Sequence, residues 1–340
     1  MSQTMTAWLQ NIAASKAKSP MPILSFPSVQ LLGVTVEDLI ASSDLQARGM
    51  KAIADAVPSL ASVSMMDLSV EAEAFGSSIH FSHNEVPTVV GRIVETQEDA
   101  EALAVPDLQK ARRCGLYIEA IRKVCGLITD RPVFAGIIGP FSLAGRLMDV
   151  TEIMVSCYTD PELVHKVMEK TTAFLTSYAE AYRGTGAGGI LMAEPLTGLL
   201  SPELEEEFST PYVKKIVSAV QTENFLVGYH NCGNNVPSMA RSLFGVGAAF
   251  YHFGDSIHLK EMLEQAPPGV PVMGNISPSG EFLGGTPDSM RRAVYRLMEE
   301  CGRYPNFVLS SGCDIPPKSS WDNIRAFFSA AEDFSAGKAL

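Results

Sequence analysis

Apolar runs with the character of β-strands alternate with amphipathic helical stretches along almost the whole chain, and this alternation strongly constrains the fold. Near-continuous apolar strands that alternate with helices indicate parallel strands covered on both faces. Eight runs have this strand character, at residues 21–26, 61–67, 133–139, 189–194, 225–230, 248–253, 270–275 and 307–311. About eight such units favour a single (β/α)₈ TIM-type barrel over an open doubly wound sheet, so we predict this α/β architecture.

Helix starts and one irregular segment add detail to the predicted barrel. Three helices are expected to begin where an N-capping residue precedes a proline at the first helical position: Asp160-Pro161, Ser201-Pro202 and Thr286-Pro287. Residues 68–130 interrupt the alternation, because they hold two long helical stretches and a short strand at 79–82. We predict that this segment is a helical excursion inserted between barrel strands two and three.

Length and composition indicate how the chain is organised. It has 340 residues, 46% of them hydrophobic, and α/β barrels commonly reach this size as one unit. No proline- or serine-rich linker divides the chain, so we predict one domain, residues 1–340, with an N-terminal helical extension at 1–19. The six cysteines lack regular spacing, which favours reduced thiols over a disulfide framework.

Charge and hydropathy argue against several kinds of partner. The net charge of −12 and the pI near 5.0 disfavour a nucleic acid or an anionic membrane as a standing partner. No run of roughly 18 apolar residues is present to span a bilayer. The first residues also lack the basic start and apolar core of a signal peptide. We therefore expect a cytoplasmic protein.

Three residues at the ends of predicted strands form a candidate metal site. His230 and Cys232 lie two positions apart at the end of one strand, so their side chains share a face. Cys313 follows the strand at 307–311, and the C-terminal strand ends of such a barrel carry the active site. One imidazole and two thiolates predict a Zn²⁺ site with an open fourth position, which is typical of catalytic zinc. The competing interpretation is a core histidine with two buried thiols.

Four further residues are candidates for the same site. Glu194 ends the fourth predicted strand and is interpreted as a displaceable zinc ligand or a base for an incoming thiol, or else as a carboxylate that only shapes the field. Asp67, just past the second strand, is a candidate catalytic or substrate-contacting residue. Asn275, at the end of the seventh strand, and Tyr229, beside His230, are predicted to bind substrate.

The remaining histidines and cysteines do not suggest further sites. The histidines considered for a second metal lack nearby cysteines or paired carboxylates, so no second metal is expected; they are His80, His83, His252 and His258. The other cysteines lie in helical stretches and are interpreted as packing residues; they are Cys114, Cys125, Cys157 and Cys301.

The stretches around the predicted metal ligands resemble a known family. Residues 229–234 read Tyr-His-Asn-Cys-Gly-Asn and residues 312–317 read Gly-Cys-Asp-Ile-Pro-Pro. They resemble the zinc-dependent corrinoid methyltransferases, which include the methylcobamide:coenzyme M methyltransferases and form a branch of the uroporphyrinogen decarboxylase superfamily. Supporting stretches lie at 67–76, 139–145, 194–195 and 274–278, and the likeness runs from about residue 20 to residue 328.

The resemblance implies a fold, a reaction and a set of partners. It implies a (β/α)₈ barrel in which His230, Cys232 and Cys313 match the zinc ligands. It also implies that a methyl group passes between the cobalt of a corrinoid and a zinc-activated thiol such as coenzyme M. The chain lacks an Asp-x-His-x-x-Gly corrinoid-binding motif, so the corrinoid is expected on a separate protein that docks over the barrel mouth.

Two other functions stay open at this point. The superfamily's decarboxylases carry an arginine-rich segment after the first strand, whereas residues 26–33 here contain no arginine. A lyase that acts on a carboxylated substrate is nevertheless an alternative, with Cys232 and Cys313 incidental. A non-catalytic protein that only holds a corrinoid protein is the other. Several methyl acceptors, both directions of transfer and any oligomeric state are compatible with the sequence.

Overall fold

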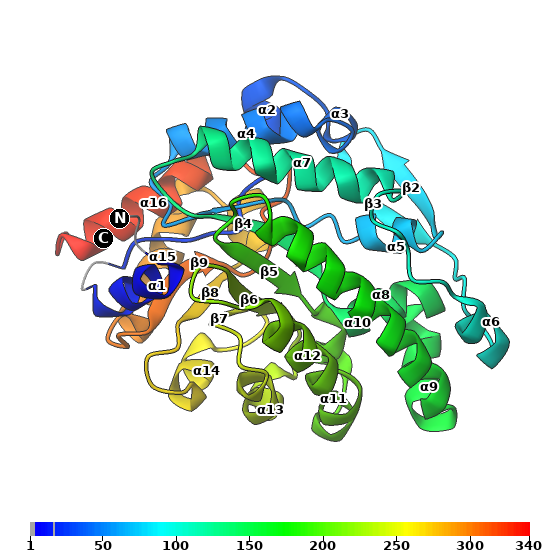
Figure 1. Cartoon of the computed structure of the whole chain (residues 1–340). Coiled ribbons are helices and arrows are strands. Elements are labelled where there is room, and N and C mark those ends of the chain that lie inside the picture. The colour runs from blue at the N-terminus through cyan, green and yellow to red at the C-terminus, as the bar shows by residue number, and fades with distance from the viewer. Residues whose placement is uncertain (1–3, 16–17) are drawn as a thin grey trace.

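A parallel sheet of seven strands forms the centre of the molecule in this computed structural model, which describes residues 4–15 and 18–340. Figure 1 shows the sheet curled, with helices around its outside. In sheet order the strands are β1 (Ser62–Val63), β4 (Val133–Ile138), β5 (Gly189–Ala193), β6 (Leu226–Asn231), β7 (Phe250–Phe253), β8 (Val272–Ile276) and β9 (Phe307–Ser311). Each adjacent pair is parallel, so the predicted parallel α/β architecture is confirmed.

The predicted first strand, at residues 21–26, is not among the strands found in the described residues, so the count of eight is not met. This segment nevertheless contacts both edges of the sheet. The Met21 amide donates to the Leu309 carbonyl over 2.9 Å, and the Leu60 amide donates to the Pro20 carbonyl over 2.9 Å. Because Pro22 has no N–H, it cannot add a ladder bond at the next position. The segment therefore bridges β9 and β1 without the regular pairing of a strand.

Helices of 6 to 23 residues form the outer layer. They are α4 (Ser43–Ala56), α7 (Arg112–Leu127), α10 (Pro161–Arg183), α11 (Pro202–Phe208), α12 (Thr210–Val220), α13 (Ala240–Gly245), α14 (Leu259–Gln265), α15 (Pro287–Cys301) and α16 (Trp321–Ser335). The three helix starts expected from capping are confirmed, since Asp160, Ser201 and Thr286 each accept a hydrogen bond from a backbone amide of the first turn. Sequence alone fixes these starts because the cap and the proline act locally.

Two apolar layers hold the sheet in place. Phe134, Leu191, Phe250 and Val308 belong to a cluster inside the curl of the sheet. A larger cluster fills the space between the sheet and the outer helices, and it includes Tyr229. Because successive strand residues point to opposite faces, each strand supplies both layers. The layer that a side chain joins therefore decides whether it can face the interior site.

The connection between β1 and β4 differs from the prediction. It contains α5 (Val70–Ala74), an antiparallel hairpin of β2 (Ser78–Ser82) and β3 (Glu85–Val90), the short α6 (Gln97–Ala102) and then α7. Only one of the two long helical stretches expected there is long, and the expected short strand pairs with a second strand that was not predicted. Figure 1 shows this hairpin at the periphery, away from the seven-stranded sheet.

Further helices and helical turns lie in the connections between these elements. They are α2 (Ser28–Leu32), α3 (Val36–Ile40), α8 (Pro140–Met148), α9 (Val150–Thr159), the 3₁₀ turns η1 (Pro195–Leu199) and η2 (Val236–Met239), and the π-helical turn η3 (Pro278–Leu283). The predicted N-terminal extension at 1–19 includes α1 (Met5–Ala14), whereas its residues 1–3 and 16–17 lie outside the described residues.

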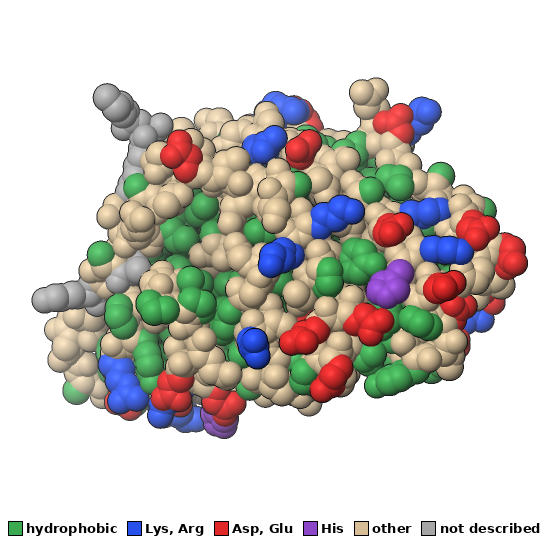
Figure 2. All heavy atoms as spheres, turned by 60° about the horizontal axis from the view of Figure 1, so that its bottom comes forward, with side chains coloured by type: hydrophobic (Ala, Val, Ile, Leu, Met, Phe, Trp, Pro, Cys, Tyr) green, Lys and Arg blue, Asp and Glu red, His purple; other side chains and the backbone are tan. Residues whose placement is uncertain are grey.

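Surface composition agrees with an acidic protein. Acidic residues number 38 against 26 basic ones, and the face in Figure 2 intersperses both kinds with hydrophobic side chains. Among the residues described, no helix combines the length and the apolar character needed to cross a bilayer.

Candidate metal centre

His230 lies on the inner face of β6, near the C-terminal end of that strand. Leu226, four residues earlier, belongs to the interior cluster, and alternation places His230 on the same face. β6 pairs with β5 and β7, where His230 stands opposite Ala193 and His252. The imidazole is 1% exposed, so the fold fixes its position from all sides.

The loop that carries Cys232 is held by three contacts. The Asn231 carboxamide oxygen accepts the Gly233 amide over 2.9 Å, and the Ser256 hydroxyl donates to the Cys232 carbonyl over 2.8 Å. A side chain at Gly254 would place its Cβ only 2.6 Å from the Cys232 Cα, so glycine is required for this close approach. These contacts turn the backbone so that Cys232 follows His230 into the same region.

Cys313 follows β9, the edge strand of the same sheet, which lies three strands away from β6. The Gly312 amide donates to the Ile276 carbonyl over 2.7 Å, which ties this turn to β8. The Asp314 carboxylate accepts the Met66 amide over 2.8 Å, which ties it to the end of β1. The segment is therefore fixed on both sides of the cysteine.

The three side chains converge as predicted. The ligand atoms of His230, Cys232 and Cys313 all lie within 4.8 Å of one another. The Cys313 sulfur is 3.5 Å from His230 Nε2. Tetrahedral zinc with ordinary Zn–S and Zn–N bonds implies about 3.6 Å between a sulfur and a nitrogen ligand. The spacing and the donor types therefore fit a zinc ion, with one coordination position left for another ligand.

The two thiols differ in their electrostatics. The hydrogen bond from Cys313 and, after it, the contact with His230 lower the pKa of Cys232 to about 4, although burial opposes this. The hydrogen bond to Cys232, together with burial, raises the pKa of Cys313 well above its ordinary value. The pair thus shares one proton near neutral pH, because a second negative charge beside the first is unfavourable without a cation.

A second histidine lies directly behind His230. His252 Nδ1 is 2.8 Å from His230 Nδ1, and His252 Nε2 is 2.8 Å from the Ser310 hydroxyl. Burial lowers the pKa of His252 well below its ordinary value, so the ring is neutral. Sequence reasoning considered His252 only for a second metal and missed this position. A signal was present, because β6 and β7 each carry a Tyr-His pair, and the two pairs stand in register.

The expected absence of a second metal concerned His80, His83, His252 and His258. Within the described ranges, the one group of three or more His, Cys, Asp or Glu residues close enough to hold a metal is His230, Cys232 and Cys313.

Glu194, predicted as a displaceable ligand or a base, or else as a carboxylate that only shapes the electrostatic field, accepts hydrogen bonds within the protein. One carboxylate oxygen accepts the Phe141 amide over 2.8 Å, and the other accepts the Ser142 amide over 2.9 Å and the Ser142 hydroxyl over 2.6 Å. These donors lie at the start of α8, so the carboxylate caps that helix from a neighbouring strand. It is not part of the three-residue group, and burial raises its pKa to about 7.

Asp67 is likewise occupied by partners within the protein. Its Oδ1 accepts the amide and hydroxyl of Ser69, while its Oδ2 accepts the Tyr117 hydroxyl over 2.6 Å and contacts the Arg113 guanidinium. The side chain is completely buried. The structure therefore gives Asp67 the position of an internal ion-pair partner.

The two predicted substrate-binding residues have different placements. Tyr229 is buried in the outer layer, where its hydroxyl lies 3.2 Å from that of Thr197, because it alternates with the inward His230. Asn275 lies closer to the centre. Its side-chain amide donates to the carbonyls of Gly254 over 2.8 Å and Ile257 over 2.9 Å, and it thereby supports the segment packed against Cys232.

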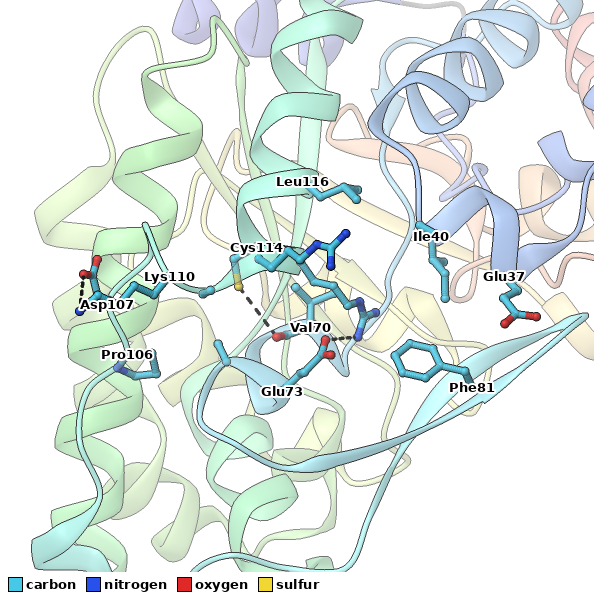
Figure 3. A pocket seen from close by; sticks show the side chains of 15 residues that line it. Glu37, Ile40, Val70, Glu73, Phe81, Pro106, Asp107, Lys110, Cys114 and Leu116 are labelled. Atoms are coloured by element: carbon cyan, nitrogen blue, oxygen red, sulfur yellow. Dashed lines mark hydrogen bonds and ion pairs between the residues drawn. The ribbon is translucent and has the colours of Figure 1, made fainter.

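A separate cavity of about 540 Å³ opens beside the β2–β3 hairpin. Figure 3 shows Phe81 of the hairpin and Glu73 of α5 along its wall. Arg113, which also lines it, pairs with Glu73 over 2.7 Å and with the buried Asp67. None of the three candidate metal ligands lines this cavity.

Comparison with known proteins identifies the family. The model of the uroporphyrinogen decarboxylase (URO-D) family matches residues 28–334. The chain belongs to this family. The superfamily indicated by the sequence resemblance is therefore confirmed. An enzymatic role follows at the level of the family, and the specific chemistry depends on the site.

Relatives of two named activities match at similar identity. The uroporphyrinogen decarboxylase of Alcanivorax borkumensis is 24% identical over 311 residues, covering 88% of this chain and 86% of the relative. The methylcobamide:CoM methyltransferase MtbA of Methanosarcina acetivorans is 26% identical over 272 residues, covering 79% and 78%. Sequence identity therefore does not separate decarboxylation from methyl transfer.

Solved structures support the fold. A methyltransferase from Methanosarcina mazei superposes with a TM-score of 0.85 at 24% identity, covering 98% of this chain and 99% of that one. A B12-independent methionine synthase from Shewanella superposes with a TM-score of 0.61 at 13% identity, covering 94% and 96%. At these identities the likeness concerns the barrel-like fold alone.

Proposed function

We propose that this protein is a zinc-dependent methyltransferase that moves a methyl group between a corrinoid and a thiol such as coenzyme M. The observation that carries the proposal is the convergence of His230, Cys232 and Cys313, whose ligand atoms lie within 4.8 Å of one another. The similarity to a methylcobamide:CoM methyltransferase supports the same reaction class. Zinc is the proposed cofactor, held by these three residues.

The donor set suits thiol activation. A bound zinc ion supplies deprotonation of an incoming thiol. Cys232 and Cys313 contribute two negative charges and His230 contributes a neutral nitrogen, so these donors already balance the charge of the ion. The charge of an added thiolate is then not cancelled, and its sulfur remains nucleophilic. The buried His230 fixes the inner side of the site, whereas the two cysteines are only partly buried, so a substrate approaches from the side of the sulfurs.

The corrinoid is proposed to arrive on a separate protein that docks over the barrel mouth. This part of the proposal rests on the lack of an Asp-x-His-x-x-Gly motif in the chain. The mouth is where the three side chains meet, because they lie at the C-terminal ends of β6 and β9.

Decarboxylation of a porphyrinogen is the second candidate, and the decarboxylase relatives at 24–26% identity favour it. The segment after the first predicted strand argues against it. Residues 26–33 contain no cation for the carboxylates of such a substrate. Gln30 in this segment donates instead to the Pro317 and Ser319 carbonyls, over 2.7 and 2.8 Å.

The decisive experiment follows methyl transfer in the visible spectrum. Zinc-loaded protein is mixed anaerobically with methylcobalamin and a panel of thiols, and conversion of methyl-Co(III) to Co(I) is recorded. We expect a rate that depends on zinc and is lost in Cys313→Ala. Cys301→Ala, which changes a buried thiol in α15, is the matched control and should keep the rate. Release of CO₂ from uroporphyrinogen by zinc-free protein would instead establish the decarboxylase.

A further inference from the structure

We propose that His252 and Ser310 are positioning residues that fix the tautomer of His230, so that the lone pair of its Nε2 faces Cys232 and Cys313. This inference rests on the proposed metal centre and extends it, because it identifies the residues that prepare one ligand before any metal arrives. Three consecutive hydrogen bonds carry it, and they begin at a group whose role is fixed by its chemistry.

That group is the backbone carbonyl of Met21, which can only accept a hydrogen bond. The Ser310 hydroxyl lies 2.8 Å from it and donates its single proton there. The Ser310 oxygen then has only lone pairs to offer to His252 Nε2, which is 2.8 Å away. His252 must therefore carry its proton on Nε2 and donate it to Ser310.

The second step is the contact between the two imidazoles. His252 is 1% exposed, and a buried ring without a hydrogen-bonded carboxylate is neutral, with one N–H. Because that N–H is on Nε2, Nδ1 of His252 is an acceptor. His230 Nδ1 lies 2.8 Å from it and must be the donor. In the singly protonated ring, which is the form that binds a metal, the other nitrogen, Nε2, then carries the lone pair, and it lies 3.5 Å from the Cys313 sulfur.

The choice of an imidazole as acceptor affects the charge of the site. Ligating histidines commonly donate their second N–H to a carboxylate or a carbonyl. A carboxylate at this position would add a negative charge beside two thiolates. The neutral His252 contacts His230 Nδ1 over 2.8 Å and adds no charge, so the balance between the ion and its two thiolates would be preserved.

The series of hydrogen bonds also gives a function to the N-terminal segment that lies between β9 and β1 without regular strand pairing. It runs through the interior from β6 to β7 and β9 and ends on the segment at residues 20–25. The Met21 amide donates to the Leu309 carbonyl over 2.9 Å, so the accepting carbonyl is held against the strand that carries Ser310. The N-terminal segment thus helps to set the chemistry of a ligand more than 200 residues away in the sequence.

The first test is direct and needs no metal. The full chain, freed of metal by a chelator and labelled with ¹⁵N-histidine, has six histidines, few enough to assign His230 in a long-range ¹H–¹⁵N spectrum by comparison with variants. We expect His230 with a protonated Nδ1 and a bare Nε2. Ser310→Ala should introduce the other tautomer. A protonated Nε2 in the wild type would overturn the proposal.

The second test measures zinc affinity by competition with a chromophoric chelator. His252→Leu and Ser310→Ala should weaken binding about 10- to 100-fold, the usual cost of losing a group that orients a ligand. His252→Asn should largely restore it, because its side-chain oxygen can accept from His230 Nδ1. Ser311→Ala removes a neighbouring buried hydroxyl that accepts from the Ile23 amide instead, and it should leave zinc affinity unchanged.

The two tests separate the inference from the proposed function. A folded His252→Leu variant with wild-type zinc affinity would contradict the positioning role while leaving the metal centre intact. A wild-type protein that binds no zinc would remove the proposed function. In that case the tautomer measured in the metal-free chain would still decide whether His252 and Ser310 control His230.

Discussion

Polar side chains stand at the ends of four strands, but they differ in whether other parts of the protein hydrogen-bond to them. The ends of β6 and β9 form one region of this comparison, and the ends of β1 and β5 form the other. Cys232 and Cys313 keep sulfur atoms directed at one another and at His230 Nε2. In contrast, both oxygens of Asp67 and both oxygens of Glu194 accept hydrogen bonds from within the protein. A position at the mouth of a barrel is therefore not enough for reactivity, because the side chain must also retain an unused lone pair.

The difference has a structural cause. α8 starts directly after β4, and its free amides lie beside Glu194 at the end of the adjacent β5. The connection after β1 returns Arg113 and Tyr117 of α7 toward Asp67. After β6 the chain instead continues as a loop in which Gly233 packs closely against Gly198 and Cys232 packs closely against Gly254, the residue after β7.

The largest expected effect is the loss of zinc when one of the two converging thiols is removed. Purified protein should hold about one zinc ion per chain, and Cys232→Ala should lose it, because two remaining ligands hold zinc poorly. Elemental analysis after gel filtration measures the content. Cys125→Ala, which removes a partly buried thiol elsewhere, should keep one ion per chain. Equal zinc in the wild type and Cys232→Ala would exclude Cys232 from the site.

The next largest effect concerns Asp67, whose carboxylate is hydrogen-bonded within the protein. Asp67→Ala should lower the free energy of unfolding by about 3–5 kcal/mol, since it leaves the largely buried Arg113 without its inner partner. Glu73→Ala removes the outer partner, whose side chain is 37% exposed, and should cost less than about 1 kcal/mol. Urea denaturation measures both. Zinc content should be normal in each variant, and loss of zinc in Asp67→Ala would connect the two regions after all.

A third prediction concerns a buried carboxylate that accepts a hydrogen bond with only one of its two oxygens. Glu71 of α5 accepts the Ile138 amide with Oε1, and its buried Oε2 has no partner among the described residues. Burial raises its pKa to about 7 from an ordinary 4.5. Below pH 4.5 the group is neutral in both the folded and the unfolded chain. As the pH rises to about 7, the unfolded chain releases the proton first.

The free energy of unfolding should therefore fall between these two pH values, by on the order of 3 kcal/mol for this group. Glu71→Gln cannot titrate and should make that part of the stability profile less steep, whereas Glu194, whose pKa is also raised to about 7, keeps its own contribution. Denaturation at pH 5 and pH 8 provides the measurement. Glu73→Gln, which changes an exposed carboxylate in the same helix, is the control. An identical slope in Glu71→Gln and wild type would show that Glu71 ionises normally.

The smallest expected effect tests whether the Glu194 carboxylate stays hydrogen-bonded to α8 and takes no part in zinc binding. Glu194→Gln should keep one zinc ion per chain with nearly unchanged affinity, because the carboxylate caps α8 instead of contacting the group of ligands. Chelator competition detects a change of about threefold or more. A marked loss of affinity would favour the other interpretation, in which this carboxylate leaves the helix and becomes a zinc ligand.

Local sequence patterns predicted much of the fold. Seven of the eight apolar runs are strands of the sheet, and the helix starts at Asp160, Ser201 and Thr286 follow the capping pattern. The run at 21–26 was assigned to a strand on its apolar character, but the missing amide of Pro22 prevents regular pairing there. The β2–β3 hairpin was only half predicted, because Pro87 lies inside the second strand, Glu85–Val90, and an internal proline argues against a strand.

The candidate site was likewise predicted only in part from local sequence patterns. The placement of Tyr229 followed from a rule already available, since a residue next to an inward His230 must point outward, and the prediction of substrate binding overlooked it. The roles of His252 and Ser310 required knowledge of which strands are neighbours and in which register. The roles of Glu194 and Asp67 required the positions of α8 and α7.

The sequence by itself determined which residues stand at strand ends and that His230, Cys232 and Cys313 can meet, because the two-residue period places His230 and Cys232 on one face and the C-terminal ends of parallel strands lie at the same end of a barrel. Only the tertiary structure decided which of the polar side chains remain free to react. A hydrogen-bond acceptor is used or unused according to what packs against it, and its partners come from distant segments: α8 for Glu194, α7 for Asp67, and the Met21 carbonyl, through Ser310 and His252, for His230.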